Sequence, residues 1–147
     1  MTRRQIIALA SRGAKFLDRI HPSWYKEINI SQLDLSDGTC CIIGQLNGGD
    51  YSPEMYLESQ IREGITATVE QRLRTEAKKI NIPGFKSCEI GFDLDDCVER
   101  AVAKGMEGFD ENTHGFNLPC GDDTSENFSI LTEVWVGLIR ARRAKRT

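Results

Sequence analysis

The sequence predicts a mostly α-helical protein that folds as a single compact domain. Three observations predict it: apolar residues recur at helical spacing in several segments, capping residues flank these segments, and a chain of 147 residues has the usual size of one domain. The composition, 39% hydrophobic and 28% charged, is typical of an ordinary globular protein. We therefore expect several helices packed around one core.

The first helix is expected over residues 3–20. Thr2 and Gln5 have the spacing of a capping box, and Pro22 ends the segment. A short second helix is expected from Ser23 to Ile28, and its Trp24 is large enough to anchor a core.

The stretch from Leu33 to Leu46 is the most apolar and least charged part of the chain. Residues 39–46 could form a short buried helix or a strand, and we expect the helix, with Ser36 or Thr39 as the N-cap and Gly48 at the C-terminal end. This segment would be the buried central element of the fold.

A further helix is expected to start at Ser52-Pro53-Glu54, run to about Glu63, pause at Gly64 and resume through Lys79. Its second part carries a stripe of apolar residues about four apart, which indicates packing on one side: Ile65, Val69, Leu73, Ala77 and Ile80. Ile82-Pro83-Gly84 is expected to end it.

The segment from Cys88 to Asp123 is acidic and rich in glycine, and we expect a loop region with one short helix over residues 95–104. It repeats a small phrase three times, as Gly91-Phe92-Asp93, Gly108-Phe109-Asp110 and Gly115-Phe116-Asn117. In each phrase the glycine permits a bend and the phenylalanine is expected to enter the core. A strong helix follows from Ser125 to about residue 145, and its Trp135 is expected to meet Trp24 in the core.

The net charge of −3 hides an uneven distribution, because two basic termini flank an acidic middle. The acidic segment suggests a surface that binds a positively charged partner, with these candidates: Asp93, Asp95, Asp96, Asp110 and Glu111. Residues 140–147 form a basic tail that is suited either to nucleic-acid phosphates or to the negative end of its own helix: Arg140, Arg142, Arg143, Lys145 and Arg146. Self-association between the tail and the acidic segment of a second copy is a third interpretation.

The cysteines and histidines offer a weaker case for chemistry. The possible soft ligands are Cys40, Cys41, Cys88, Cys97, Cys120, His21 and His114, and only His114 and Cys120 come near to the spacing of a zinc site. A Cys40 nucleophile with His21 or His114 as base lacks a recognisable motif, and the acids around Asp93 lack the order of a calcium loop. Buried thiols and helix-starting acids explain these residues better, so we expect no catalytic residue, no metal and no cofactor.

No apolar run approaches the roughly 18 residues of a membrane span. The N-terminal apolar patch is short and broken by charges, which argues against a signal peptide. Five cysteines without an export signal favour reduced thiols, and we expect a cytoplasmic protein.

Several motifs together resemble a group of small hypothetical proteins encoded by actinobacterial phages and prophages. The motifs are Gly13…Leu17-Asp18, Pro22-x-Trp24, Ile28-x-Ile30-x-x-Leu33-Asp34-Leu35, Cys41-x-x-Gly44-Gln45-Leu46, Gly115-Phe116 and Leu131-Thr132…Trp135…Ile139. The match covers residues 13–46 and 115–143, so residues 50–110 look like an insertion relative to that group. The resemblance implies a mobile-element origin and a role in host takeover, anti-defence or phage assembly, and it transfers no catalytic residue.

The leading hypothesis is therefore a non-enzymatic phage accessory protein that binds a host or phage protein, as an inhibitor for example. The alternatives are a nucleic-acid-binding factor that uses the basic termini, a virion-associated structural protein, and a small-ligand or metal-binding protein centred on Cys40, Cys41 and Gln45.

Overall fold

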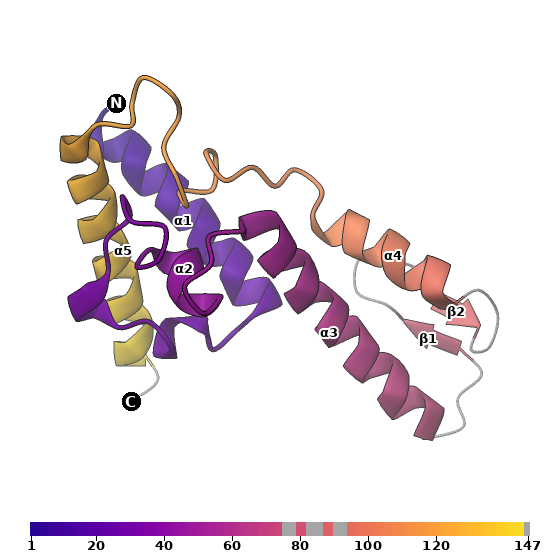
Figure 1. The fold of residues 1–147 in the computed structure, drawn as a ribbon. Helices are drawn as coiled ribbons and strands as arrows, with labels where there is room; N and C mark the ends of the chain where they lie inside the picture. Colours follow the sequence, from indigo (N-terminus) through magenta and orange to yellow (C-terminus); the bar gives the residue numbers. More distant parts are fainter. Residues whose placement is uncertain (75–78, 82–86, 90–93, 146–147) are drawn as a thin grey trace. The chain divides into compact units, whose positions relative to one another are not determined.

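The computed structural model describes residues 1–74, 79–81, 87–89 and 94–145, and these form a mostly helical chain, as the sequence predicts (Figure 1). The elements in order are α1 (Arg3–Ile20), the 3₁₀ turns η1 (Trp24–Lys26) and η2 (Ile30–Gln32), α2 (Ile42–Leu46), α3 (Pro53–Arg74), the strands β1 (Lys79–Asn81) and β2 (Ser87–Glu89), α4 (Leu94–Gly105) and α5 (Ser125–Lys145). Among these described residues, no helix is both long and apolar enough to cross a membrane.

The contacts of the chain divide it into two compact units. Unit 1 consists of Met1–Pro53 together with Phe109–Thr147, and unit 2 is Glu54–Gly108. The bounds of unit 2 fall close to the ends of the 50–110 segment, whose status as an insertion stays a prediction. Unit 1 has eleven basic and eleven acidic residues, whereas unit 2 has eight basic and eleven acidic residues.

The core of unit 1 lies between α1 and α5, which run side by side (Figure 1). Trp24 and Trp135 are fully buried and meet edge to face with their ring centroids 5.6 Å apart, which confirms the prediction that they share the core. Phe116 stacks on Trp135 at 5.5 Å. Such aromatic pairs contribute about 0.5–1.5 kcal/mol each beyond the area that they bury.

Two glycines let the backbone of residues 114–116 lie directly against α1. A Cβ atom on Gly13 would be 2.0 Å from the His114 carbonyl oxygen, and one on Gly115 would be 2.6 Å from the Ala10 nitrogen. Gly115 also has a φ of +70°, which an L residue rarely adopts. The buried Trp135 indole then donates to the Gly115 carbonyl at 2.8 Å, so the segment is held from both sides.

The Gly-Phe phrases behave as expected in the two places that the structure describes. Gly108 and Gly115 both have positive φ values, Phe116 is buried, and Phe109 packs on Phe16 with their centroids 5.4 Å apart. The third phrase, residues 91–93, lies outside the described residues.

The central element is a short helix, as predicted, but its N-cap is neither Ser36 nor Thr39. Cys41 caps α2, and its sulfur accepts a hydrogen bond from the Gly44 N–H at 3.3 Å. The helix ends at Asn47, and Gly48 follows with a φ of +66°. The Gly49 N–H then bonds to the Gly44 carbonyl at 2.6 Å, which is the 6→1 bond of a Schellman motif.

The predicted helices at the N-terminus and in the last segment are confirmed as α1 and α5. Of the expected second helix, residues 24–26 form a 3₁₀ turn. The predicted pause at Gly64 is wrong, because α3 continues through it to Arg74. One exposed glycine destabilises a helix by only about 1 kcal/mol, which is too little to interrupt a helix that has several regular turns on each side.

The prediction that helix resumes through Lys79 is also wrong. Lys79–Asn81 is strand β1, and Ile80 pairs with Cys88 of the antiparallel strand β2. A β-branched residue shortly before Pro83 favours extended backbone over helix, and the second strand supplies its hydrogen bonds. The side chains of Val69, Leu73 and Ala77, and the turn 82–84, lie outside the described part of the chain.

Unit 2 pairs α3 with α4. Arg62 and Glu99 form a two-pronged ion pair at 2.8 and 2.9 Å, and Gly105 admits the side chain of Ile61. The α4 range agrees with the predicted helix 95–104 within one residue at each end.

Candidate interaction surfaces

One face of unit 1 is built from acidic loops that meet at Tyr51. The Tyr51 side chain lies against Gly38, where an added Cβ would be 3.1 Å from the Tyr51 Cβ. Its hydroxyl donates a hydrogen bond to the Glu111 carboxylate. Burial, together with this hydrogen bond, raises the pKa of Tyr51 well above its ordinary value, so the phenol keeps its proton and its role as donor.

We call this surface the acidic loops and define it by the carboxylates near these junctions: Asp34, Asp37, Asp50, Asp110 and Glu111. Glu111 is half-buried, and the four aspartates are exposed. The sequence had pointed to only the last two of these residues. Asp34 and Asp37 are each followed two residues later by Ser36 or Thr39, a spacing typical of an Asx turn, and this signal was present in the sequence.

The carboxylates are fixed by short hydrogen bonds to their own loops. Asp34 Oδ1 accepts from the Ser36 N–H at 3.0 Å, and Asp37 Oδ1 accepts from the Thr39 N–H at 2.9 Å. Asp110 Oδ1 accepts from the Asn112 N–H at 2.7 Å. The hydrogen bonds from Thr39 lower the pKa of Asp37, so this exposed group is negatively charged at neutral pH.

The five acids named in the sequence prediction fall in different parts of the structure. Asp110 and Glu111 belong to unit 1 and to the acidic loops. Asp95 and Asp96 lie on α4 in unit 2, where the structure does not describe their side chains, and Asp93 lies outside the described residues. A single face made of all five therefore stays a prediction.

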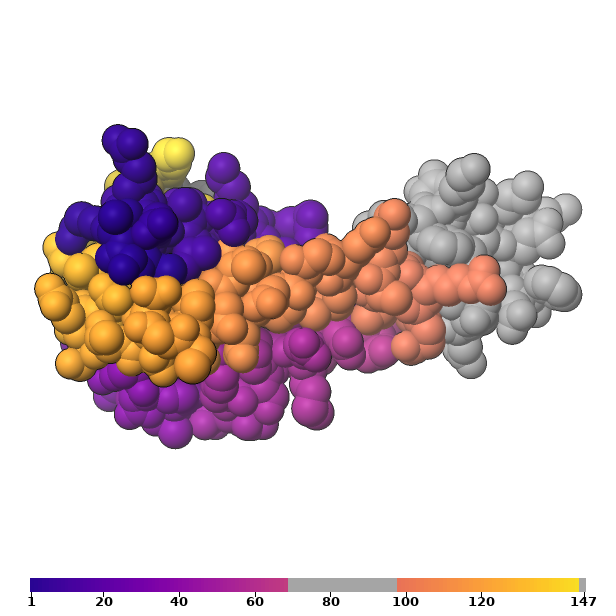
Figure 2. Space-filling model, turned by 90° about the horizontal axis from the view of Figure 1, so that it is seen from above, coloured from indigo at the N-terminus to yellow at the C-terminus, as the bar shows by residue number. Residues whose placement is uncertain are grey.

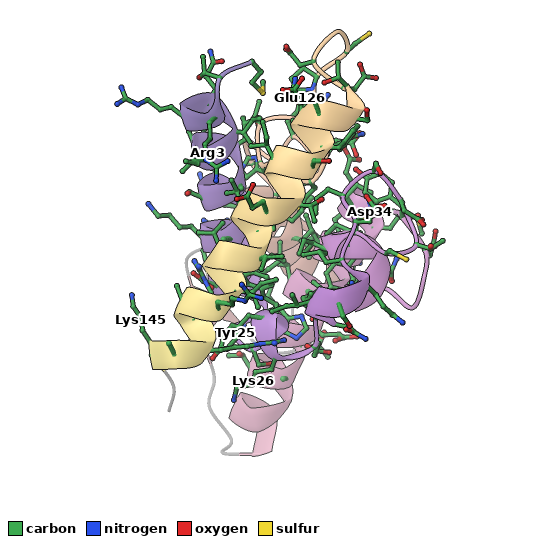
Figure 3. The ribbon with its side chains drawn as sticks, turned by 90° about the vertical axis from the view of Figure 1, so that its left-hand side faces the viewer. Arg3, Tyr25, Lys26, Asp34, Glu126 and Lys145 are labelled. Carbon is green, nitrogen blue, oxygen red and sulfur yellow. The ribbon has the colours of Figure 1, made fainter. Side chains whose placement is uncertain are left out.

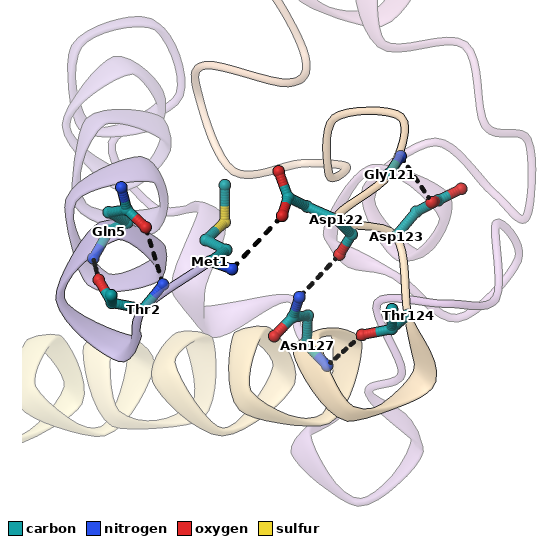
Figure 4. A network of polar contacts seen from close by, with 8 residues as sticks. All are labelled: Met1, Thr2, Gln5, Gly121, Asp122, Asp123, Thr124 and Asn127. Carbon is teal, nitrogen blue, oxygen red and sulfur yellow. Dashed lines mark hydrogen bonds and ion pairs between the residues drawn. The ribbon is translucent and has the colours of Figure 1, made fainter.

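Asp122 and Asp123 instead hold the start of α5 against the N-terminus (Figure 4). Asp122 Oδ1 lies 3.4 Å from the Met1 ammonium nitrogen, and the Asp122 carbonyl accepts from Asn127 Nδ2 at 2.9 Å. Asp123 accepts from the Gly121 N–H at 3.2 Å. Figure 4 also shows the capping box of Thr2 and Gln5, which confirms that prediction. These acids have a structural use inside unit 1.

Two of the C-terminal arginines are likewise engaged within unit 1. Arg142 binds both carboxylate oxygens of Asp18 at 2.9 and 2.7 Å, and its guanidinium lies 5.6 Å from the centroid of the Trp24 ring. Asp18 also accepts from the Trp24 indole at 2.9 Å. Arg143 donates to the carbonyls of Tyr25 at 2.9 Å and Ile28 at 2.6 Å. Arg142 thus ties α5 to α1, and Arg143 ties α5 to the segment that follows α1.

Because Arg142 and Arg143 bind within unit 1, fewer of the basic residues in 140–147 are available to bind nucleic acid. Arg140 and Lys145 are exposed on the last turns of α5, and Arg146 lies outside the described residues. A shallow groove of about 360 Å³ lies beside them, lined by Asp18, Pro22, Tyr25, Ala141, Arg142 and Lys145. Because Arg142 and Asp18 already bind each other there, the groove offers little unmatched charge.

The neighbourhood of Cys40, Cys41 and Gln45 is structural. Burial raises the pKa of the Cys41 thiol, which disfavours the thiolate needed of a nucleophile or metal ligand. The Gln45 amide donates to the carbonyls of Asn29 at 3.2 Å and Cys40 at 2.9 Å, and it accepts from the Asn29 N–H at 2.6 Å. These bonds tie α2 to the preceding loop.

The histidines contribute to structure in the same way. His21 lies 2.6 Å from a Glu27 oxygen, and His114 packs edge-on against Phe16 and belongs to the turn that starts at Asp110. In the described part of the chain, no three His, Cys, Asp or Glu residues are grouped as metal ligands would be. The side chains of Cys88 and Cys97 lie outside that part.

No protein-family model, no curated protein and no solved structure matches this chain. The resemblance to small proteins of actinobacterial phages and prophages therefore stays a prediction.

Proposed function

We propose that this protein is a non-enzymatic accessory protein of an actinobacterial phage or prophage that binds a host or phage protein through the acidic loops. The observation that carries the proposal is that the exposed Asp34, Asp37 and Asp110 are fixed by hydrogen bonds within their loops. Tyr51 links these loops through its contacts with Gly38 and Glu111. The partner would present a basic surface, such as the nucleic-acid channel of a host protein. Binding there would serve host takeover or anti-defence in the host cytoplasm.

The geometry of the loops supports this proposal. A carboxylate already held by an Asx turn loses little side-chain freedom when a partner binds, which reduces the entropic cost of association. A cluster of like charges also steers a basic partner during encounter and disfavours acidic ones. The acidic loops thus present ordered negative charge of the kind that a phosphate-binding surface accepts.

The first experiment is a tagged pull-down from an actinobacterial host lysate, with and without nuclease, read by mass spectrometry. We expect one dominant host protein to survive nuclease treatment. Mixed nucleic-acid proteins that disappear with nuclease would favour the basic termini instead, and an empty pull-down would favour a virion or small-ligand role.

A variant tests whether the acidic loops make the contact. Asp37→Asn, Asp50→Asn and Asp110→Asn remove three charges but keep the amide oxygen that can accept the hydrogen bonds of each turn. The combined variant should fold normally and lose the captured protein. A matched control removes three exposed acids from helices, as Glu54→Gln, Glu63→Gln and Glu126→Gln, and should retain it.

The acids of unit 2 need their own variant, because the sequence prediction includes them. Capture by a protein that carries Asp93→Asn, Asp95→Asn and Asp96→Asn would show that the α4 end of the acidic segment is dispensable. If neutralising all of the predicted acids left capture unchanged, the acidic surface would be excluded. Elemental analysis that finds stoichiometric metal would favour the metal-binding alternative.

A further inference from the structure

We infer that the exposed face of α1 binds the phosphate backbone of duplex nucleic acid. This face consists of α1 residues, whereas the acidic loops lie outside α1, so the inference does not rest on the proposed function. It concerns a set of basic residues that α1 places along one side of the helix: Arg4, Arg12, Lys15 and Arg19.

The helical repeat aligns these four side chains. At 100° per residue they fall within an arc of about 80°, and at 1.5 Å per residue the stripe is about 22 Å long. All four are exposed, while the opposite face of the helix is buried against the core through Ile6, Ala10, Ala14 and Leu17. The only acid in α1 is Asp18, which Arg142 already binds. The stripe therefore carries positive charge without a negative residue between its members.

Arg3 lies on another face of α1 and pairs with Glu133 of α5 at 3.3 Å, so it adds no unmatched charge to the stripe. In Figure 3, Arg3 and Lys145 lie along one side, and Asp34 of the acidic loops lies on the other. Figure 2 shows the indigo N-terminal residues at the surface, beside the orange segment. The Arg12 guanidinium donates a hydrogen bond to the Thr113 carbonyl oxygen at 3.0 Å. Arg12 thus joins the stripe to the turn that starts at Asp110, and the remaining positive charge of this face comes from Arg4, Lys15 and Arg19.

The composition of the stripe favours a phosphate backbone over an acidic protein. Specific protein interfaces depend on a buried centre of aromatic or large apolar anchors. Within or beside the arc of the stripe the helix has the small side chains of Ala8 and Ser11, and Ile7, which is 43% exposed, lies about 60° outside the arc. Long cationic side chains without an anchor fit phosphate contacts, which position a protein on a duplex without reading its sequence. Single-stranded binding relies instead on exposed aromatic platforms, and α1 carries only Phe16, which is buried.

The test uses the full chain and a fluorescent DNA duplex of about 20 base pairs, with anisotropy read from 50 to 300 mM salt. Four phosphate contacts predict a slope of about −3.6 for log K against log salt, and a dissociation constant of about 10⁻⁴ to 10⁻⁶ M near physiological salt. Changing the DNA sequence should leave both values unchanged.

A triple variant, Arg4→Gln, Lys15→Gln and Arg19→Gln, leaves Arg12 to hold Thr113. We expect its affinity to fall by at least about 30-fold at 50 mM salt and its slope to approach about −0.9. A control with the same change in net charge, Lys26→Gln, Arg100→Gln and Lys104→Gln, alters other exposed residues and should bind the duplex nearly as well as the wild type.

Three results would overturn the inference: no duplex binding by the wild type at 50 mM salt, an equal loss in the control variant, or tighter binding to a single strand of the same length. Sedimentation of the free protein gives a further check. A dimer that disappears in the stripe variant and in the acidic-loop variant would assign the stripe to a second copy of the chain. Duplex binding that survives neutralisation of the acidic loops keeps this inference distinct from the proposed function.

Discussion

Replacing Gly13 with alanine should destabilise the protein, although the same change in most helices is stabilising. Replacing an exposed glycine within a helix by alanine raises the free energy of unfolding by about 1 kcal/mol. At Gly13 the new Cβ would be 2.0 Å from the His114 carbonyl oxygen and 3.0 Å from Trp135 Cζ2, where ordinary contacts begin at 3.4 Å. The first neighbour is backbone and cannot rotate away, so the 114–116 segment or α1 has to move by more than 1 Å.

The size of the effect follows from what that movement disturbs. Overpacking of a core costs about 1–3 kcal/mol. Loss of the Trp135 hydrogen bond to the Gly115 carbonyl would leave a buried indole N–H unsatisfied, which costs about 1–3 kcal/mol more. After subtracting the propensity gain, we expect Gly13→Ala to lower the free energy of unfolding by about 1–5 kcal/mol, or to lower the Tm by about 2–20 °C.

Urea unfolding followed by circular dichroism and tryptophan fluorescence measures this change. The matched control is Gly137→Ala in the middle of α5, where an added Cβ meets nothing within 4 Å, and it should raise the Tm by about 2–4 °C. If Gly13→Ala were as stable as the wild type, or shifted in the same direction as the control, the close approach of residues 114–116 to α1 would be refuted.

Three further predictions concern single side chains. Arg142→Gln should lower the free energy of unfolding by about 1–2 kcal/mol by removing the ion pair with Asp18, whereas Arg140→Gln should stay within about 0.5 kcal/mol in the same urea assay. Because burial raises the pKa of Cys41, the unfolded chain loses that proton first, so stability is full below the ordinary thiol pKa of about 8.5 and falls as the pH rises above it. Cys41→Ser replaces the capping sulfur with a hydroxyl oxygen and should flatten that fall between about pH 8.5 and 9.5, while an unchanged slope would assign the fall to another group. Tyr51→Phe should cost about 1 kcal/mol of stability and weaken capture of the partner, and equal capture would show that the tie to Glu111 is unimportant for binding.

The elements that the sequence predicts correctly are those with local signals. The capping box at Thr2, the helical spacing through α1 and α5, and the glycine after α2 each depend on residues only a few positions apart. The shared core of Trp24 and Trp135 follows from residue size, since two large apolar side chains on amphipathic segments are most stable when buried together.

Features that join distant residues could not be predicted in this way. Arg142 and Asp18 are 124 positions apart, and their ion pair packs part of the predicted basic tail against α1. Tyr51 and Glu111 are 60 positions apart, so the acidic loops appear only when the chain closes on itself. Strand β1 needed its partner β2, because three residues contain too little local information to distinguish a strand from a helix end.

The most direct test of the proposed function is a titration of the captured, purified partner with the wild type and with the Asp37→Asn, Asp50→Asn, Asp110→Asn variant. We expect the variant to bind with a dissociation constant at least about 30-fold larger than the wild type and to keep the wild-type unfolding midpoint, while the control variant at Glu54, Glu63 and Glu126 binds like the wild type. Equal affinity of the wild type and the folded variant would contradict the claim that the acidic loops bind the partner.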